Sequence, residues 1–210
     1  MKIFIFIVVS LGILLFLSSC GLLYTTKYDK EAFELAEEYG GIYVFDKEIR
    51  DEIKKLQEEE SKMKIGVGDP NFFDKIKART EKYSTLSNGC KYFIGIFGDR
   101  GDKFEPYKPY YEKIKEYMGE KVYNKLSYGI LTTSYYKCGD KVIPLTFYVN
   151  VYGTRTDYGL YGFDEANGGY RFSEDSSIEA NADNIFYLIN DKFVKSNQKI
   201  SEEKTGRGLY

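Results

Sequence analysis

The sequence predicts an α+β protein in which N-terminal helices precede a mostly antiparallel, curved sheet. Three observations support this prediction. Apolar residues recur at helical spacing in three segments between residues 29 and 83. Beyond Gly119 they alternate with polar residues, which is typical of strands with one covered face. An uncharged apolar stretch at residues 3–17 precedes these segments and is typical of a cleaved signal peptide.

The apolar stretch is too short for a membrane span, because a transmembrane helix needs about 20 residues. It ends in Leu17-Ser18-Ser19-Cys20, which resembles the lipobox of bacterial lipoproteins. In that family the cysteine thiol receives a diacylglycerol group, the chain is cut before the cysteine, and the new amino terminus is acylated, for example with palmitate. The resemblance implies a signal peptide at residues 1–19, lipid attachment at Cys20 and a tether at residues 20–28.

Location follows from the implied lipid anchor. Two or more acyl chains give stable attachment to a bilayer, so we expect a protein of the bacterial cell envelope held on the membrane. Gly21, rather than aspartate, follows the cysteine, which is similar to lipoproteins sorted to the outer membrane of Gram-negative cells. An uncleaved anchor is the alternative, because extending the apolar run to Leu23 would just reach spanning length.

Three helices are predicted in the first third of the domain. The first covers residues 29–39 and stops at Gly40-Gly41. Asp46 caps the second, and Asp69-Pro70 starts the third with aspartate as the cap and proline in the first turn. The apolar positions of the three helices are Phe33, Ala36, Ile49, Ile53, Leu56, Phe72, Phe73, Ile76 and Tyr83.

Strands dominate the rest of the predicted domain, which we place at residues 29–195. A fourth helix, opened by Pro106 and Pro109 and ended by Gly119, interrupts them. Asn190-Asp191 is expected to turn a terminal hairpin, and residues 196–210 to form a flexible tail. The predicted strands cover residues 92–97, 126–136, 142–152, 158–163, 170–172, 185–189 and 193–194.

The strand at residues 142–152 supplies a candidate binding face. Its inward positions would be apolar, and its outward positions would carry two tyrosines and an asparagine. Tyrosine suits half-exposed surfaces because its ring is apolar and its hydroxyl forms hydrogen bonds. The chain has 21 tyrosines, however, and the codon usage of an AT-rich genome is the preferred explanation of this abundance. The outward residues of the candidate face are Tyr148, Asn150 and Tyr152.

The order of elements over residues 69–195 resembles the nuclear transport factor two-like and cystatin-like groups. In those cone-shaped folds a curved sheet wraps a long helix and can enclose a pocket. No residue motif accompanies the resemblance. It therefore implies a fold but no functional residues, since the same folds host enzymes, binding modules and structural domains.

The chain has no histidine, which removes the commonest general acid or base and the Ser-His-Asp and Cys-His nucleophile pairs. We therefore nominate no catalytic residues, no metal ligands and no cofactor. The 30 basic and 32 acidic residues are interspersed, so the sequence offers no basic footprint for nucleic acid. The tripeptide Arg100-Gly101-Asp102 matches an integrin-binding motif, but such a short match is more often a simple turn.

With Cys20 lipidated, two cysteines remain, an even number in an exported chain. Cys90 lies just before a predicted strand and Cys138 in a predicted hairpin turn. A disulfide between them would stabilise the fold by about 3 to 4 kcal/mol through chain entropy. Two free or buried thiols are the alternative, because bacterial envelopes differ in how oxidising they are.

These observations predict a membrane-anchored envelope lipoprotein that acts as a non-enzymatic binding or interaction module. Besides the membrane, its partner would be another envelope protein, a peptide, a glycan or a small molecule. One alternative is a hydrolase or lyase of the cone fold that uses carboxylates or tyrosines. A second is a surface-exposed structural or adhesive lipoprotein, with the loop around Arg100 as one contact.

Overall fold

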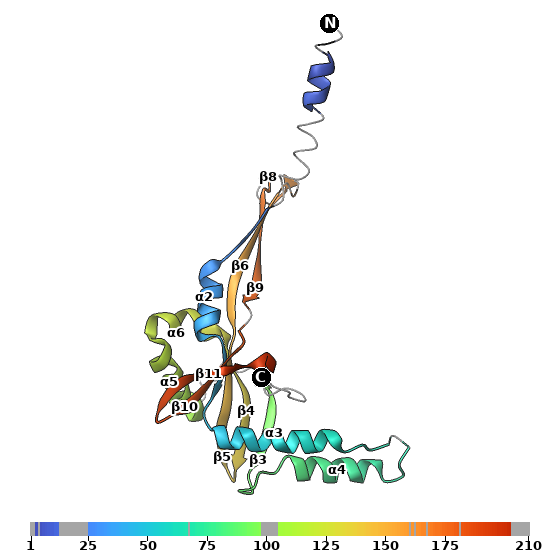
Figure 1. Cartoon of the computed structure of the whole chain (residues 1–210), viewed down its shortest axis with the longest axis vertical. Helices are drawn as coiled ribbons and strands as arrows, with labels where there is room; N and C mark the ends of the chain where they lie inside the picture. The colour runs from blue at the N-terminus through green and yellow to red at the C-terminus, as the bar shows by residue number, and fades with distance from the viewer. Residues whose placement is uncertain are drawn as a thin grey trace. The chain divides into compact units, whose positions relative to one another are not determined.

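The computed structural model describes residues 3, 5–12, 25–66, 68–97, 105–159, 161, 163–166, 168–180 and 182–202. The described chain is α+β, as predicted, with open sheets whose strands are mostly antiparallel (Figure 1). The chain divides into two compact units. Unit 1 comprises Met1–Phe33 and Tyr152–Glu179, and unit 2 comprises Glu34–Val151 and Ala180–Tyr210.

Unit 2 is built on a six-stranded sheet with the order β11-β10-β2-β5-β4-β3. Neighbouring strands are antiparallel except β10 and β2, which run parallel. Both predicted hairpins form, one at Gly139 and one at Asn190-Asp191, where both residues take the positive φ that a tight hairpin turn requires. The strands are β2 (Gly41–Val44), β3 (Lys91–Phe97), β4 (Ile130–Cys138), β5 (Lys141–Val149), β10 (Asn184–Ile189) and β11 (Lys192–Lys199).

The predicted helices form, with two differences. Asp46 caps its helix by accepting a hydrogen bond from the Ile49 amide at 3.0 Å. The next helix starts later than Asp69, whose carboxylate instead accepts the Asn71 amide at 2.9 Å. A short helix also follows Gly119 directly, where strand was expected. The helices are α2 (Lys30–Tyr39), α3 (Lys47–Lys62), α4 (Phe72–Tyr83), α5 (Lys108–Met118) and α6 (Glu120–Leu126).

One face of the six-stranded sheet packs an aromatic core against α5. Tyr43 stacks on Phe186 with ring centroids 4.4 Å apart, and Tyr111 of α5 meets Phe147 edge-on at 4.8 Å. Ile114, from the same helix, is fully buried. Because aromatic side chains bury large apolar areas, this layer accounts for much of the core of unit 2.

The opposite face of the same sheet is covered as well, so the expectation of one open face is wrong. Arg50 of α3 donates a hydrogen bond from Nη1 to the hydroxyl of Tyr187 at 3.0 Å, and Ile53 of α3 packs with Leu145. The side chains clustered on this face with Tyr148 are Ile42, Val44, Ile185, Tyr187 and Ile200.

Several boundaries also differ from the sequence predictions. Residues 25–28, expected in the tether, form β1 (Thr25–Tyr28). The strand expected at residues 142–152 breaks at Asn150, whose amide donates to the Gly129 carbonyl, and continues as β6 (Val151–Tyr158). The expected tail holds the end of β11 and the 3-10 turn η4 (Ile200–Glu202), whose Ile200 is buried. Within the described residues, no helix combines the length and apolar character needed to cross a membrane.

Candidate functional site

Unit 1 contains a three-stranded sheet in the order β1-β6-β9, where β9 is Ser173–Ala180. β1 pairs antiparallel with β6, so that Thr25 lies opposite Tyr158 and Lys27 opposite Thr156. A separate small hairpin joins β7 (Phe163–Asp164) to β8 (Gly169–Tyr170), where longer strands were expected. The three-stranded sheet is largely polar along all of its strands, unlike the sheet of unit 2.

One face of β6 carries a row of hydroxyl-bearing side chains, which we call the tyrosine–threonine row: Tyr152, Thr154, Thr156 and Tyr158. These residues share a face because successive side chains of a strand point to opposite sides. Tyr152 is 55% exposed and Tyr158 is 43% exposed. At about 3.4 Å per residue, the row is about 20 Å long.

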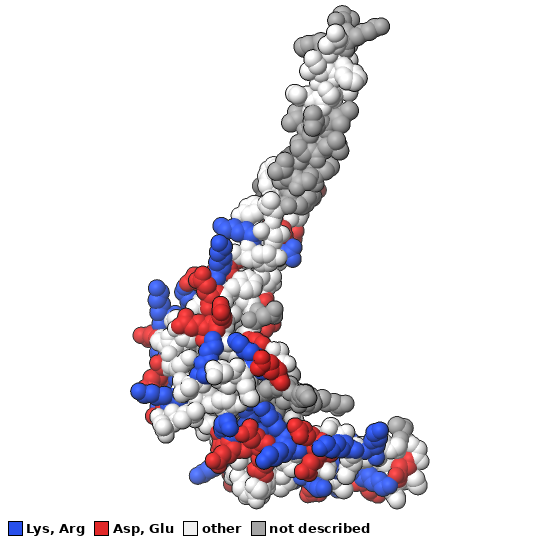
Figure 2. All heavy atoms as spheres, in the orientation of Figure 1, with Lys and Arg blue, Asp and Glu red and all other residues white. Residues whose placement is uncertain are grey.

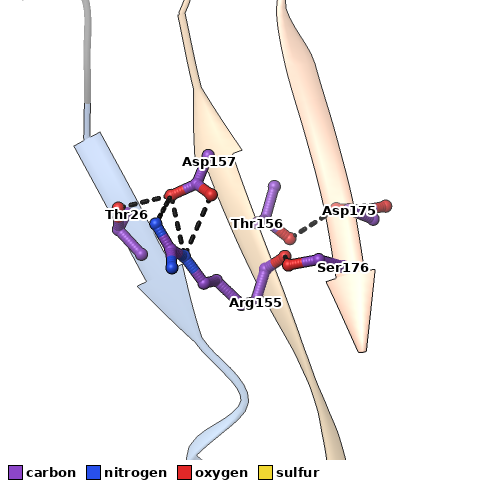
Figure 3. A network of polar contacts seen from close by, with 6 residues as sticks. All are labelled: Thr26, Arg155, Thr156, Asp157, Asp175 and Ser176. Carbon is purple, nitrogen blue, oxygen red and sulfur yellow. Dashed lines mark hydrogen bonds and ion pairs between the residues drawn. The ribbon is translucent and has the colours of Figure 1, made fainter. Parts of the chain in front are cut away.

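Charged neighbours extend the row to the strands on either side. Lys27 of β1 lies opposite Thr156, so the two side chains share a face. Thr156 donates a hydrogen bond from its hydroxyl to Oδ1 of Asp175, on β9, at 2.7 Å. Figure 3 shows this hydrogen bond bridging β6 and β9. The surface therefore combines exposed rings, hydroxyl groups and single charges of both signs.

The other face of β6 carries the residues that tie β1 to it. Arg155 contacts the Asp157 carboxylate through Nε and Nη2 at 2.9 to 3.1 Å, and Thr26 of β1 donates its hydroxyl to the same carboxylate at 2.5 Å (Figure 3). The Thr26 hydroxyl and then the guanidinium lower the pKa of Asp157, while the carboxylate raises the pKa of Arg155. These polar contacts hold the register of β1 against β6.

The start of α2 packs on the same side as Arg155 and Asp157. A Cβ on Gly153 would lie 2.6 Å from the Cβ of Ala32, so only glycine fits at this point of β6. Tyr28 and Phe33 meet edge-on, with ring centroids 6.1 Å apart. The start of α2 therefore covers the Gly153 side of β6, and the tyrosine–threonine row lies on the opposite side.

An open hollow of about 720 Å³ borders the row. Its lining includes Thr154, Thr156 and Tyr158 from β6 and the chain from Thr26 to Glu31. A second hollow, of about 260 Å³ in unit 2, lies near Tyr117 and Phe193. Three of its charged side chains are paired with one another, because Lys113 contacts Asp191 at 2.6 Å and Glu116 at 3.4 Å. The first hollow is therefore the better candidate for a ligand.

The residues of the predicted binding face are not displayed together. Tyr148 is half-buried and donates its hydroxyl to the Ala182 carbonyl at 2.9 Å, and Asn150 is buried. Tyr152 alone among the three is exposed, and it belongs to the tyrosine–threonine row. The expected face fails because Tyr148 sits on a sheet covered on both sides and because the strand breaks at Asn150.

Cys90 and Cys138 form a disulfide, with Cα atoms 4.7 Å apart at the end of the β3–β4 pair. The structure therefore contradicts the alternative that Cys90 and Cys138 are free thiols. Cys20 and the loop around Arg100 lie outside the described residues. Among the residues that are described, no group of three or more acidic or cysteine side chains could hold a metal ion.

Sequence reasoning missed most of this site because it placed Thr25–Tyr28 in a tether and assigned no strand to Ser173–Ala180. A signal was nonetheless present in the alternation of tyrosine and threonine from Tyr152 to Tyr158. Comparisons with protein-family models, with curated proteins and with solved structures found no match.

Proposed function

We propose that this chain is a lipid-anchored, non-enzymatic protein of the bacterial cell envelope that binds an extended glycan on the tyrosine–threonine row. The observation that carries the proposal is the exposure of Tyr152 and Tyr158 at the two ends of a line of threonine hydroxyls on one face of β6. The lipobox resemblance at Cys20 supports the anchored location.

The chemistry of the row fits a sugar polymer better than it fits the other partner classes expected from the sequence. A tyrosine ring can stack on the apolar face of a sugar, while its hydroxyl stays hydrated. Threonine hydroxyls donate and accept hydrogen bonds, which matches sugar hydroxyls. A small molecule is usually held in a concave site that covers most of its surface, whereas this row is open and about 20 Å long. An extended ligand can contact the row along its whole length.

The hydrolase alternative has less support. Carboxylate-based glycoside cleavage needs one carboxyl group with a raised pKa to act as the general acid. Hydrogen-bond donors lower the pKa of two described carboxyl groups, Asp69 and Asp157. A lowered pKa keeps a carboxylate ionised and so favours a structural or ligand-binding role over acid catalysis.

The binding half of the proposal can be tested by retention on insoluble glycans. The full chain, purified in detergent, would be incubated with peptidoglycan sacculi and, in parallel, with chitin. We expect retention on at least one polymer and roughly tenfold weaker retention for Tyr152→Ala/Tyr158→Ala, which corresponds to about 1.4 kcal/mol. Tyr128→Ala is the matched control, because Tyr128 is 78% exposed but lies in unit 2. Equal retention of all three proteins would contradict the proposed site.

The anchoring half needs a separate measurement. Cells expressing the wild-type chain or Cys20→Ser would be labelled with palmitate, and membrane proteins would be analysed by mass. We expect labelled, shortened protein for the wild type and unlabelled, full-length precursor for the variant. A wild-type chain that keeps its first 19 residues would instead support the uncleaved anchor.

A further inference from the structure

Helices α3 and α4 form a hairpin whose far end, which we call the hairpin tip, comprises residues 61–66 and 68–77. The two helices lie side by side and extend away from the strands of unit 2 (Figure 1). Arg79 of α4 pairs with Glu60 of α3 at 3.0 Å and so joins the helices behind the tip. The tip is therefore held at the end of an ordered helical arm.

Apolar side chains are exposed at this tip. Phe73 is 84% exposed, more than any other large apolar side chain described in unit 2. Met63 and Ile76 are 39% and 36% exposed, and Phe72 packs edge-on against Phe73 with centroids 5.5 Å apart. Single exposed apolar residues are common on protein surfaces, but several of them within one short protruding segment favour an interaction site.

The hairpin tip is also basic. It holds Lys62, Lys64, Lys75 and Lys77 against only Asp69 and Asp74, whereas the whole chain has a net charge of −2. Lys62, Lys64 and Lys77 are exposed, while Lys75 is paired with Asp69. Figure 2 shows basic and acidic side chains mixed along α3 and α4. The acidic run Glu58-Glu59-Glu60 directly precedes the tip, so the excess of lysine is confined to residues 61–66 and 68–77.

We propose that the hairpin tip docks on an anionic lipid surface, with Phe73 and Met63 entering the headgroup region and the lysines contacting acidic headgroups. Exposed aromatic and apolar side chains flanked by lysine are the composition that binds the bilayer interface. Lysine suits such a place because its apolar stem lies along the hydrocarbon boundary while its ammonium stays in water. Each basic residue near an anionic surface adds to the attraction. This inference does not depend on the tyrosine–threonine row.

The absence of tryptophan from the chain allows a direct test. Phe73→Trp places the only tryptophan at the tip, and Tyr128→Trp places it at a comparably exposed position of the same unit. Both full-length variants would be reconstituted into vesicles of phosphatidylcholine, with or without phosphatidylglycerol. The N-terminal stretch is the same in both, so a difference between them reports the position of the tryptophan.

We expect the fluorescence of the Phe73→Trp variant to shift to shorter wavelength and to be quenched by brominated lipids in the anionic vesicles, with a weaker effect in pure phosphatidylcholine. The Tyr128→Trp variant should show neither change. Adding Lys62→Glu and Lys64→Glu to the Phe73→Trp chain should abolish the response. The proposal would be overturned if the two tryptophan variants behaved alike. It would also be overturned if a higher protein concentration, without vesicles, produced the same fluorescence shift. The partner of the tip would then be a second copy of the chain.

Discussion

Arg50 and Tyr187 form a buried contact in which the guanidinium lies near the tyrosine ring and Nη1 donates to the hydroxyl at 3.0 Å. Arg50 has no exposed surface, and Tyr187 is 8% exposed. A charge removed from water is costly unless hydrogen bonds satisfy it. The phenol oxygen therefore helps a basic helix residue to occupy the core, and it fixes α3 against β10.

Replacing Tyr187 with phenylalanine should destabilise unit 2 by about 1.5 to 3 kcal/mol, because a hydrogen bond to a buried charged group is lost while the ring is kept. Urea unfolding followed by circular dichroism would measure the change. Tyr152→Phe is the control, since Tyr152 is 55% exposed and its hydroxyl is accessible to water. A difference below about 0.5 kcal/mol between the two variants would show that the contact contributes little.

Breaking the Cys90–Cys138 disulfide should lower the free energy of unfolding by about 4 kcal/mol. The estimate follows from the chain entropy of a loop closed across a separation of 48 residues. Denaturation with and without reductant would measure it, and Cys90→Ser/Cys138→Ser should be as unstable as the reduced wild type and insensitive to reductant. A wild-type stability that reductant leaves unchanged, once thiol assay confirms reduction, would refute this expectation.

Two glycines with positive φ should respond very differently to alanine. At Gly41 the φ is +126° and a Cβ would overlap the Asn184 carbonyl oxygen, whereas at Gly89 the φ is +79° and no atom lies within 4 Å. We expect Gly89→Ala to cost about 1 kcal/mol from backbone strain alone. Gly41→Ala should cost more than about 3 kcal/mol or prevent folding, because the β2–β10 pair must separate. Similar melting temperatures for the two variants would contradict the close approach of β2 and β10.

The free energy of unfolding of unit 2 should fall at alkaline pH. Burial raises the pKa of both Tyr92 and Tyr107 to about 12, whereas an unfolded tyrosine titrates near 10. Between these pH values the folded state binds more protons than the unfolded state. The stabilisation that these tyrosines contribute is therefore fully present below about pH 10 and is lost as the pH rises through about 12. Each tyrosine should contribute a loss of the order of 2 kcal/mol. Unfolding measured from pH 8 to 12 should show a shallower decline for Tyr92→Phe than for the exposed control Tyr152→Phe.

Most elements of unit 2 could be predicted because their patterns are local. Asp46 precedes an apolar stripe, Gly119 ends a helix, and Asn190-Asp191 separates two apolar runs, so each signal lies within a few residues. That helices cover both faces of the sheet could not be predicted from such local signals. It depends on α3 and α5 packing on opposite sides, which is a property of the tertiary structure.

The candidate site was harder to predict because strands that are polar on both faces lack the apolar alternation by which strands are recognised. Thr25–Tyr28 and Ser173–Ala180 are almost entirely exposed, so their strand character comes from pairing with β6 and not from burial. Tyr152 was identified from its neighbours Tyr148 and Asn150. It proved to belong with Thr154 and Tyr158, because the strand breaks at Asn150.

The parallel pairing of β2 with β10 sets the order in which the chain can fold. β2, at residues 41–44, lies between β5 and β10, and β10 begins only at Asn184. The centre of the sheet therefore stays incomplete until nearly all of the 210 residues are available. Contacts between such distant segments form slowly, because a long loop must close first. The complete sheet is therefore expected to form late, once the residues from Asn184 onward are available to pair with β2.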